Sequence, residues 1–362
     1  MTLHRSSANP IMVLYAGLIV YASLYPFGGW RDQGLMPWGF LFAPWPQYWS
    51  QFDTAVNFLG YAPLGFLIAL AMLRTSLLPR PVMLATLSAS ALSLCMEGLQ
   101  TYMPLRIPAL SDWLLNTLGA GAGTWLASGL EHSGGIDQWS RFRARWFERH
   151  ARGALVLLAI WPVALLFPPA VPLGLGQVFE RVEANLESLF AGSAFLVWLP
   201  IRTLELQPLV PLAEMGCVTL GLLAPCLLGH YIIKGWQRRA IFLIAACAIS
   251  IFASGLSSAL SYGPQHAWDW LSVPVQVGWG LGALLAALSL ALPPRACLAL
   301  LLVALVWQLD MLNSAPSSPY FAQTLQAWEQ GRFIRFNGLA QWLGWCWPYA
   351  ALVWALVSVS RR

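Results

Sequence analysis

The stretch Glu97–Gly123 reads EGLQTYMPLRIPALSDWLLNTLGAGAG and sets polar and charged residues between apolar runs. It contains two carboxylates, one arginine and two amides: Glu97, Asp112, Arg106, Gln100 and Asn116. Ionisable groups inside a membrane are costly, so they usually face a cavity or one another. We therefore expect this stretch to line a polar pocket within a bundle of apolar helices.

The composition of the whole chain supports a membrane setting for that bundle. Of 362 residues, 58% are hydrophobic and 10% are charged, whereas soluble domains are about a quarter charged. The net charge of +5 does not indicate a nucleic-acid partner, because the basic residues lie between apolar segments. The six cysteines lack the spacing of a metal site, and we expect neither a metal nor a cofactor.

Ten apolar segments are long enough to cross a membrane, which takes about 17–25 residues. They are 11–27, 54–73, 81–101, 110–130, 153–171, 212–233, 240–261, 271–292, 296–312 and 340–359. The sequence therefore predicts an all-α, polytopic transmembrane helix bundle of about ten helices. One further apolar segment, 189–201, is short and is interpreted as interfacial or re-entrant.

Basic residues between these segments predict the orientation, because cytoplasmic loops carry an excess of Lys and Arg. With the N-terminus inside, five groups fall on the cytoplasmic side: Arg74 and Arg80; Arg141, Arg143, Arg145, Arg149 and Arg152; Lys234, Arg238 and Arg239; Arg295; and Arg361 and Arg362. We therefore expect a multi-pass protein of the cytoplasmic (inner) membrane, with membrane lipids around it and both termini in the cytoplasm.

The chain also contains a weak internal repeat. EGLQ (97–100) and SGLS (254–257) lie 157 positions apart, as do SDW (111–113) and WDW (268–270). Because four spans return a chain to the same side, the repeat predicts two parallel four-helix units. The expected parts are a first unit at 11–130, a basic cytoplasmic loop at 131–152, a second unit at 153–292 and a C-terminal helix pair at 296–359.

The second copy lacks most of the polar set of the first copy. In this alignment Ser254 replaces Glu97, Gly263 replaces Arg106 and Val273 replaces Asn116, while Asp269 retains the acid of Asp112. Upstream, DTAVNFLG (53–60) matches EMGCVTLG (214–221) at an offset of 161, which places Val218 where Asn57 stands. We interpret the first unit as the working site and the second as a degenerate scaffold. His266, beside Asp269, is interpreted as polar surface in an outer loop.

The motifs of the first unit carry a family resemblance. The segment NFLGYAPLGFLIAL (57–70), followed by EGLQ, Arg106 and SDWLLNTLGAGAG (111–123), resembles the VanZ-like family of membrane proteins over residues 11–130. The resemblance implies a polytopic bacterial membrane protein, in a family whose founding member is associated with teicoplanin resistance. Relatives often carry His where Asn57 stands. The resemblance implies no particular reaction, so whether the protein is an enzyme stays open.

Helical spacing brings the polar residues of the first unit together in pairs. Asp112 and Asn116 share one face, as do Glu97 and Gln100, and in the expected topology these pairs lie toward the outer leaflet. Glu97 is then the candidate catalytic proton carrier and Arg106 the candidate anion clamp. Asn57, Gln100, Asp112 and Asn116 complete the expected substrate-binding wall. In the structural alternative, Glu97 and Asp112 pair with Arg106 and brace the helices.

These residues favour one function and leave two alternatives. An outward-facing polar pocket in a membrane bundle fits the binding of an amphipathic cell-envelope molecule, such as a lipid-linked glycan or lipoglycopeptide, or acid–base chemistry on it. The first alternative is a transporter or flippase of an envelope lipid. The second is an assembly factor of an exopolysaccharide pathway.

Overall fold

The computed structural model describes residues 8–25, 27–44, 51–73, 80–104, 106–167, 169–193, 195, 206, 209–316 and 334–360. These residues form twelve α-helices and short 3-10 turns, and their only β-type pairing is an isolated antiparallel bridge between Phe147 and Ile233. The all-α class predicted from the composition is confirmed.

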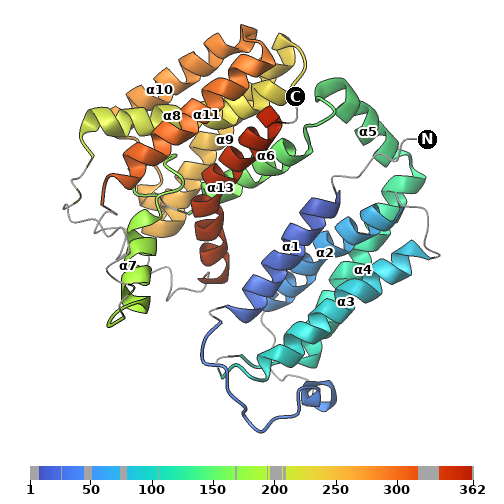
Figure 1. The fold of residues 1–362 in the computed structure, drawn as a ribbon. Coiled ribbons are helices and arrows are strands. Elements are labelled where there is room, and N and C mark those ends of the chain that lie inside the picture. Colours follow the sequence, from blue (N-terminus) through green and yellow to red (C-terminus); the bar gives the residue numbers. More distant parts are fainter. Residues whose placement is uncertain are drawn as a thin grey trace. The chain divides into compact units, whose positions relative to one another are not determined.

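The helices follow the predicted apolar segments closely (Figure 1). They are α1 (Ala8–Leu24), α2 (Gln51–Leu73), α3 (Pro81–Gln100), α4 (Leu110–His132), α5 (Gly135–Trp146), α6 (Arg152–Ala164), α7 (Phe179–Leu189), α8 (Pro211–Ile232), α9 (Trp236–Tyr262), α10 (Val273–Leu288), α11 (Pro294–Asn313) and α13 (Ile334–Ser360). Each of the ten predicted segments overlaps one of these helices. The other two, α5 and α7, were not expected as helices.

Seven helical segments within the described residues are long and apolar enough to cross a membrane: Thr54–Leu73, Pro81–Gln100, Pro211–Ile232, Trp236–Tyr262, Val273–Ala291, Pro294–Asn313 and Ala340–Ser360. Two shorter apolar helices, Asn9–Leu24 and Arg152–Ala164, accompany them. The protein is therefore a helical membrane protein set among lipids. The count of ten spans stays a prediction, and most of the segment 189–201 lies outside the described residues.

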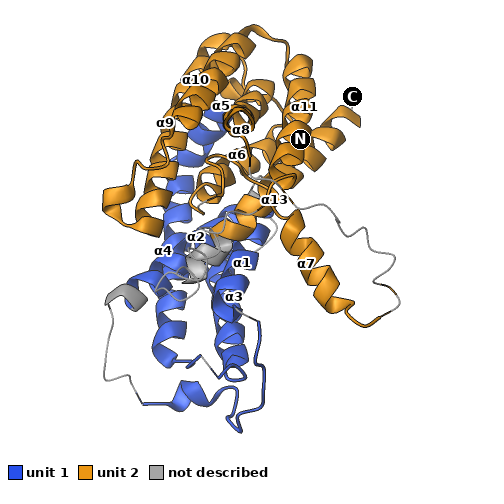
Figure 2. Ribbon diagram, turned by 90° about the vertical axis from the view of Figure 1, so that its left-hand side faces the viewer, with its two compact units in different colours: residues 1–143 blue, residues 144–362 orange. Residues whose placement is uncertain are grey.

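Contacts divide the chain into two compact units, Met1–Arg143 and Ala144–Arg362 (Figure 2). In the first unit α2 and α4 pack backbone against backbone. A Cβ atom added at Gly119 or Gly123 would collide with the carbonyl oxygen of Phe58 or Ala62, and one at Gly65 with that of Ala120. Gly119 and Gly123, four residues apart, therefore form a small-residue face on α4 that permits the close approach typical of membrane helices.

A ladder of hydrogen-bonding side chains joins α3 to α4 in the same unit. Thr86 and Thr124 share a hydrogen bond of 2.9 Å, and Ser90 and Thr117 share one of 2.8 Å. The indole N–H of Trp113 donates to Ser90 Oγ at 3.1 Å. Such bonds satisfy polar groups inside an apolar bundle and hold the two helices in register.

The second unit is built around α8, which contacts α6, α9, α10 and α11, while α13 packs on α6 and α11. Its core contains fully buried apolar residues of α8, among them Leu222, Leu227 and Leu228. Glycines again allow close packing, because a Cβ at Gly278 or Gly282 of α10 would press on backbone carbonyls of α8.

Candidate functional site

Glu97 lies on the last turn of α3 and is only 5% exposed. Its Oε2 atom accepts a hydrogen bond of 3.1 Å from the backbone N–H of Ala109, the residue that precedes α4. The first N–H groups of a helix have no partner within the helix, and the helix dipole favours an anion near them. The carboxylate of Glu97 is therefore held at the N-terminal end of α4.

Arg106 and Gln100 both reach the C-terminal end of α1. Nη2 of Arg106 donates to the carbonyl oxygen of Tyr25 at 2.8 Å and to that of Ala22 at 3.3 Å. Nε2 of Gln100 donates to the carbonyl oxygen of Ser23 at 3.1 Å. The last carbonyls of a helix lack donors of their own, and a cation near them is favourable. These contacts fit the bracing alternative for both side chains.

Asp112 and Asn116 lie on one face of α4, as their spacing predicts. Oδ1 of Asp112 accepts a hydrogen bond of 3.4 Å from the hydroxyl of Ser111. Asn116, only 5% exposed, donates from Nδ2 to Ser93 Oγ at 2.9 Å, while its Oδ1 atom is buried without a hydrogen-bond partner. Buried polar atoms are normally paired, so this carbonyl is an acceptor ready for a ligand.

Asn57 comes from α2 and is partly exposed. The next residue, Phe58, presses its carbonyl against Gly119, one turn beyond Asn116 on α4. The contacts thus place Asn57 near the level of Asn116, on the neighbouring helix. Glu97, Gln100 and Arg106 lie at one end of the same bundle, with Asp112 in the adjacent first turn of α4. Their union in one hydrogen-bonded pocket stays a prediction.

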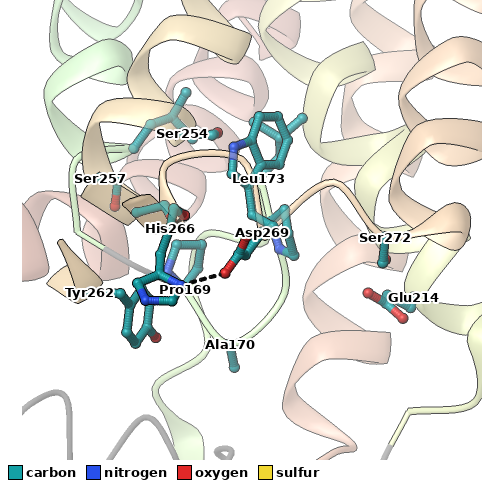
Figure 3. Close-up of a pocket in the computed structure, with 14 residues that line it drawn as sticks. Pro169, Ala170, Leu173, Glu214, Ser254, Ser257, Tyr262, His266, Asp269 and Ser272 are labelled. Carbon is teal, nitrogen blue, oxygen red and sulfur yellow. Dashed lines mark hydrogen bonds and ion pairs between the residues drawn. The ribbon is translucent and has the colours of Figure 1, made fainter. Parts of the chain in front are cut away.

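The second unit contains a cavity of about 590 Å³ that the sequence did not predict (Figure 3). Helix α9 contributes Ser254, Ser257, Ser258 and Tyr262 to its wall, and the connection from α9 to α10 contributes His266, Asp269, Trp270 and Ser272. The segment 165–173, which begins just after α6, supplies an apolar side of leucines, prolines and an alanine, and α8 contributes Glu214.

A histidine–carboxylate pair stands at this cavity. Nδ1 of His266 donates to Oδ2 of Asp269 at 2.6 Å, and their side chains are 52% and 65% exposed (Figure 3). We interpreted His266 from sequence as polar surface; it is indeed exposed, but it also lines the cavity. The signal that marks this site is the serine-rich SGLSS (254–258) followed closely by His266 and Asp269.

Within the described residues, no group of three or more His, Cys, Asp or Glu side chains could hold a metal ion. The first unit offers the buried carboxylate of Glu97 and the amide carbonyl of Asn116, which has no hydrogen-bond partner. The second offers a cavity lined by serines, two carboxylates, a histidine and apolar residues.

Comparison with known proteins identifies the first unit. The family model described as VanZ/LLP1 matches residues 7–131, about a third of the chain. A comparison with curated proteins and one with solved structures gave no match. The matched region contains α1 to α4, with Glu97, Arg106, Asp112 and the glycines of α4. Over residues 7–131 the chain is therefore similar to the VanZ-like family.

Proposed function

We propose that the protein sits in the bacterial cytoplasmic membrane and binds an amphipathic cell-envelope molecule at the polar end of its VanZ-like domain. The observation that carries the proposal is the burial of Glu97, a carboxylate at 5% exposure in a bundle of apolar helices. Ionisable groups at such places are costly to stability and mark ligand or proton pathways more often than exposed charges do. The family match supports an envelope-related role.

The contacts divide the predicted site residues by task. Nη2 of Arg106 and Nε2 of Gln100 donate to carbonyls of α1, so we assign these side chains to bracing that helix. Asn116 presents an acceptor without a hydrogen-bond partner, so we assign it to the ligand, with Asn57 and Asp112 beside it. Glu97 is the remaining ionisable group at the bundle end and is the candidate to exchange a proton with the bound molecule.

The ligand class follows from this mixture of groups. A molecule that inserts beside apolar helices needs a hydrocarbon part, and one that meets Glu97 and the amides needs hydrogen-bonding groups. A lipid-linked glycan or a lipoglycopeptide combines both, and a contribution to glycopeptide resistance would follow from sequestering or altering such a molecule. In the predicted topology this end of the bundle faces outward, where these molecules are exposed.

The test compares Glu97→Gln with the matched control Glu131→Gln, which makes the same change on an exposed residue at the other end of α4. Glutamine can still accept the hydrogen bond from Ala109, so the fold should persist in both variants. Native mass spectrometry of the full chain, gently extracted from bacterial membranes, should show a co-purified envelope lipid in the wild type and in Glu131→Gln. Glu97→Gln should lose it.

Susceptibility of the expressing cells to teicoplanin gives a second readout. Expression of the wild type and of Glu131→Gln should raise the inhibitory concentration, and expression of Glu97→Gln should not. A Glu97→Gln protein that is fully stable, retains the lipid and protects the cells would refute the assignment of Glu97.

A further inference from the structure

We propose that the cavity of the second unit is a second binding site, and that it takes an uncharged, hydroxyl-rich group such as a sugar ring carried on an apolar tail. The site lies wholly in residues 165–272 and so goes beyond the function proposed for the VanZ-like domain. Three observations within the second unit carry it. They are the short side chains at and just after the end of α9, two buried polar atoms without hydrogen-bond partners, and the charges of the described residues that line the cavity.

The first observation concerns the space itself. Ser254, Ser257 and Gly263 stand 157 positions after Glu97, Gln100 and Arg106. In the first unit Gln100 and Arg106 extend from the end of α3 to the last carbonyls of α1. The side chains of serine and glycine are too short to extend that far. In the second unit a cavity of about 590 Å³ lies between the end of α9 and the segment 165–173. The changes that we interpreted as degeneration therefore open a pocket.

The second observation concerns the wall of that pocket. The hydroxyl of Ser257, a residue only 2% exposed, and the indole N–H of Trp270 are both buried without a hydrogen-bond partner. Both residues line the cavity. An unpaired buried donor destabilises the protein, and native structures contain few of them. A ligand with hydroxyl groups would pair both, because a hydroxyl can accept from the indole and also donate to or accept from serine.

The third observation concerns charge. The described residues that line the cavity include the carboxylates Asp269 and Glu214 but neither lysine nor arginine. Phosphates and carboxylates need such cations, so an anionic head group is disfavoured. Sugar hydroxyls donate to carboxylates, and the rings of Trp270 and Tyr262 offer flat surfaces for the apolar faces of a sugar. His266 binds Oδ2 of Asp269 and fixes the carboxylate in place.

The apolar side of the cavity accounts for the tail. Leu165, Pro169, Pro172 and Leu173 present hydrocarbon to the same cavity. A free sugar would leave this side in contact with water, whereas an alkyl chain would cover it. The pocket therefore matches an amphipathic glycoside better than a soluble sugar.

The test uses photolabelling of the full chain in nanodiscs with an octyl β-D-glucoside that carries a diazirine in its tail. Mass spectrometry maps the labelled peptides, and unlabelled octyl β-D-glucoside, octyl phosphate and octylamine compete as tail-matched probes. We expect saturable labelling within 165–173 and 254–272, displaced by the glucoside at concentrations well below those of the other two. Ser257→Ala, which is nearly isosteric, should raise the half-saturating concentration about 2- to 10-fold, the value of one hydrogen bond. Trp270→Phe keeps an aromatic ring but removes the indole N–H and part of the ring surface, so it should raise that concentration at least as much.

Two further variants complete the design. Ser257→Leu should fill the cavity and abolish labelling, while Ser261→Leu makes the same change one turn along α9, outside the lining, and should leave labelling unchanged. Labelling that does not saturate, or that is insensitive to Ser257→Ala and Trp270→Phe, would overturn the proposal. Equal displacement by octyl phosphate or octylamine would also overturn it. Glu97→Gln should bind the probe normally, so this proposal and that for the VanZ-like domain fail independently.

Discussion

At the scale of single residues, the sequence indicated which side chains matter but not what they contact. Glu97, Gln100 and Arg106 stand out because charge and amides are rare in this chain. Their partners include the N–H of Ala109 and the carbonyls of α1, which are backbone groups that no sequence motif encodes. The pairing of Glu97 and Asp112 with Arg106, which the sequence suggests, stays a prediction.

The role of Arg106 can be tested by its effect on stability. Arg106→Met keeps the length of the side chain but leaves the carbonyls of Ala22 and Tyr25 without their donor. Hydrogen bonds to a charged group contribute about 1.5–3 kcal/mol, so the melting temperature of the full chain in detergent should fall clearly. Arg106→Lys should restore part of it. Arg31→Met, the same change at an exposed arginine of the first unit, is the control and should melt like the wild type.

An Arg106→Met protein with unchanged melting behaviour but no bound lipid would reverse the assignment. Arg106 would then be an anion clamp for the ligand, which is one of the two roles that the sequence suggests for it.

At the scale of helices, periodicity and spacing predicted most of the first unit. The run GAGAG (119–123) is typical of closely packed membrane helices, and Gly119 and Gly123 lie against the backbone of Phe58 and Ala62. The proposed alignment of the two copies fares less well around SDW and WDW. Asp112 lies in the first turn of α4, whereas Asp269 lies in the connection before α10 begins at Val273.

Hydrogen bonds favour a different alignment of the last helix in each proposed repeat. Asn116 of α4 donates to Ser93, and Trp279 of α10 donates to Ser250 at 3.0 Å. The accepting serines, Ser93 and Ser250, lie 157 positions apart, as the repeat predicts. The donating residues, Asn116 and Trp279, lie 163 positions apart, and the first residues of α4 and α10 have this same separation. A match as short as that of SDW with WDW cannot reveal that the loop before the last helix differs in length between the two copies. The duplication itself remains a proposal.

The glycine contacts give a prediction at this scale. Gly119→Val should force α2 and α4 apart, because the new side chain would meet the backbone of Phe58, which cannot rotate away. Overpacking of this kind costs about 1–3 kcal/mol and occasionally more, so the melting temperature should drop and expression should fall. Gly129→Val on the same helix is the control, since nothing lies within 4 Å of its Cβ position. Equal stability of the two variants would argue against the backbone contact.

For the whole molecule, hydropathy predicted where the apolar helices lie along the chain, while the count of ten spans stays a prediction. It missed α5 and α7, because both mix charged and apolar residues and neither is apolar over its whole length. Hydropathy also says nothing of cavities, which depend on side chains brought together from α8, α9 and the segment after α6. The cavity of the second unit could therefore be found only from coordinates.

The orientation of the chain in the membrane gives the last prediction. Reporter fusions after Arg362 and within 131–150 should be active only as cytoplasmic reporters, and one within 313–335 only as a periplasmic reporter. The physical reason is the cluster of arginines in 141–152 and the basic residues that follow the even-numbered predicted spans. A periplasmic signal from 131–150 would invert the arrangement and turn the polar end of the VanZ-like domain inward.

The backbone contact between α2 and α4 has a mechanical consequence. Side chains between two helices act as an adjustable layer, because rotamer changes let the helices slide past each other. Where glycine Cα atoms rest on carbonyl oxygens, that layer is missing. We therefore expect α2 and α4 to move together as one rigid pair. Any conformational change within the first unit would then involve α1 and α3. The C-terminal end of α1 is held by hydrogen bonds from the long, flexible side chains of Gln100 and Arg106. Because these side chains can change rotamer without losing contact, we expect α1 to be the helix that can change its tilt.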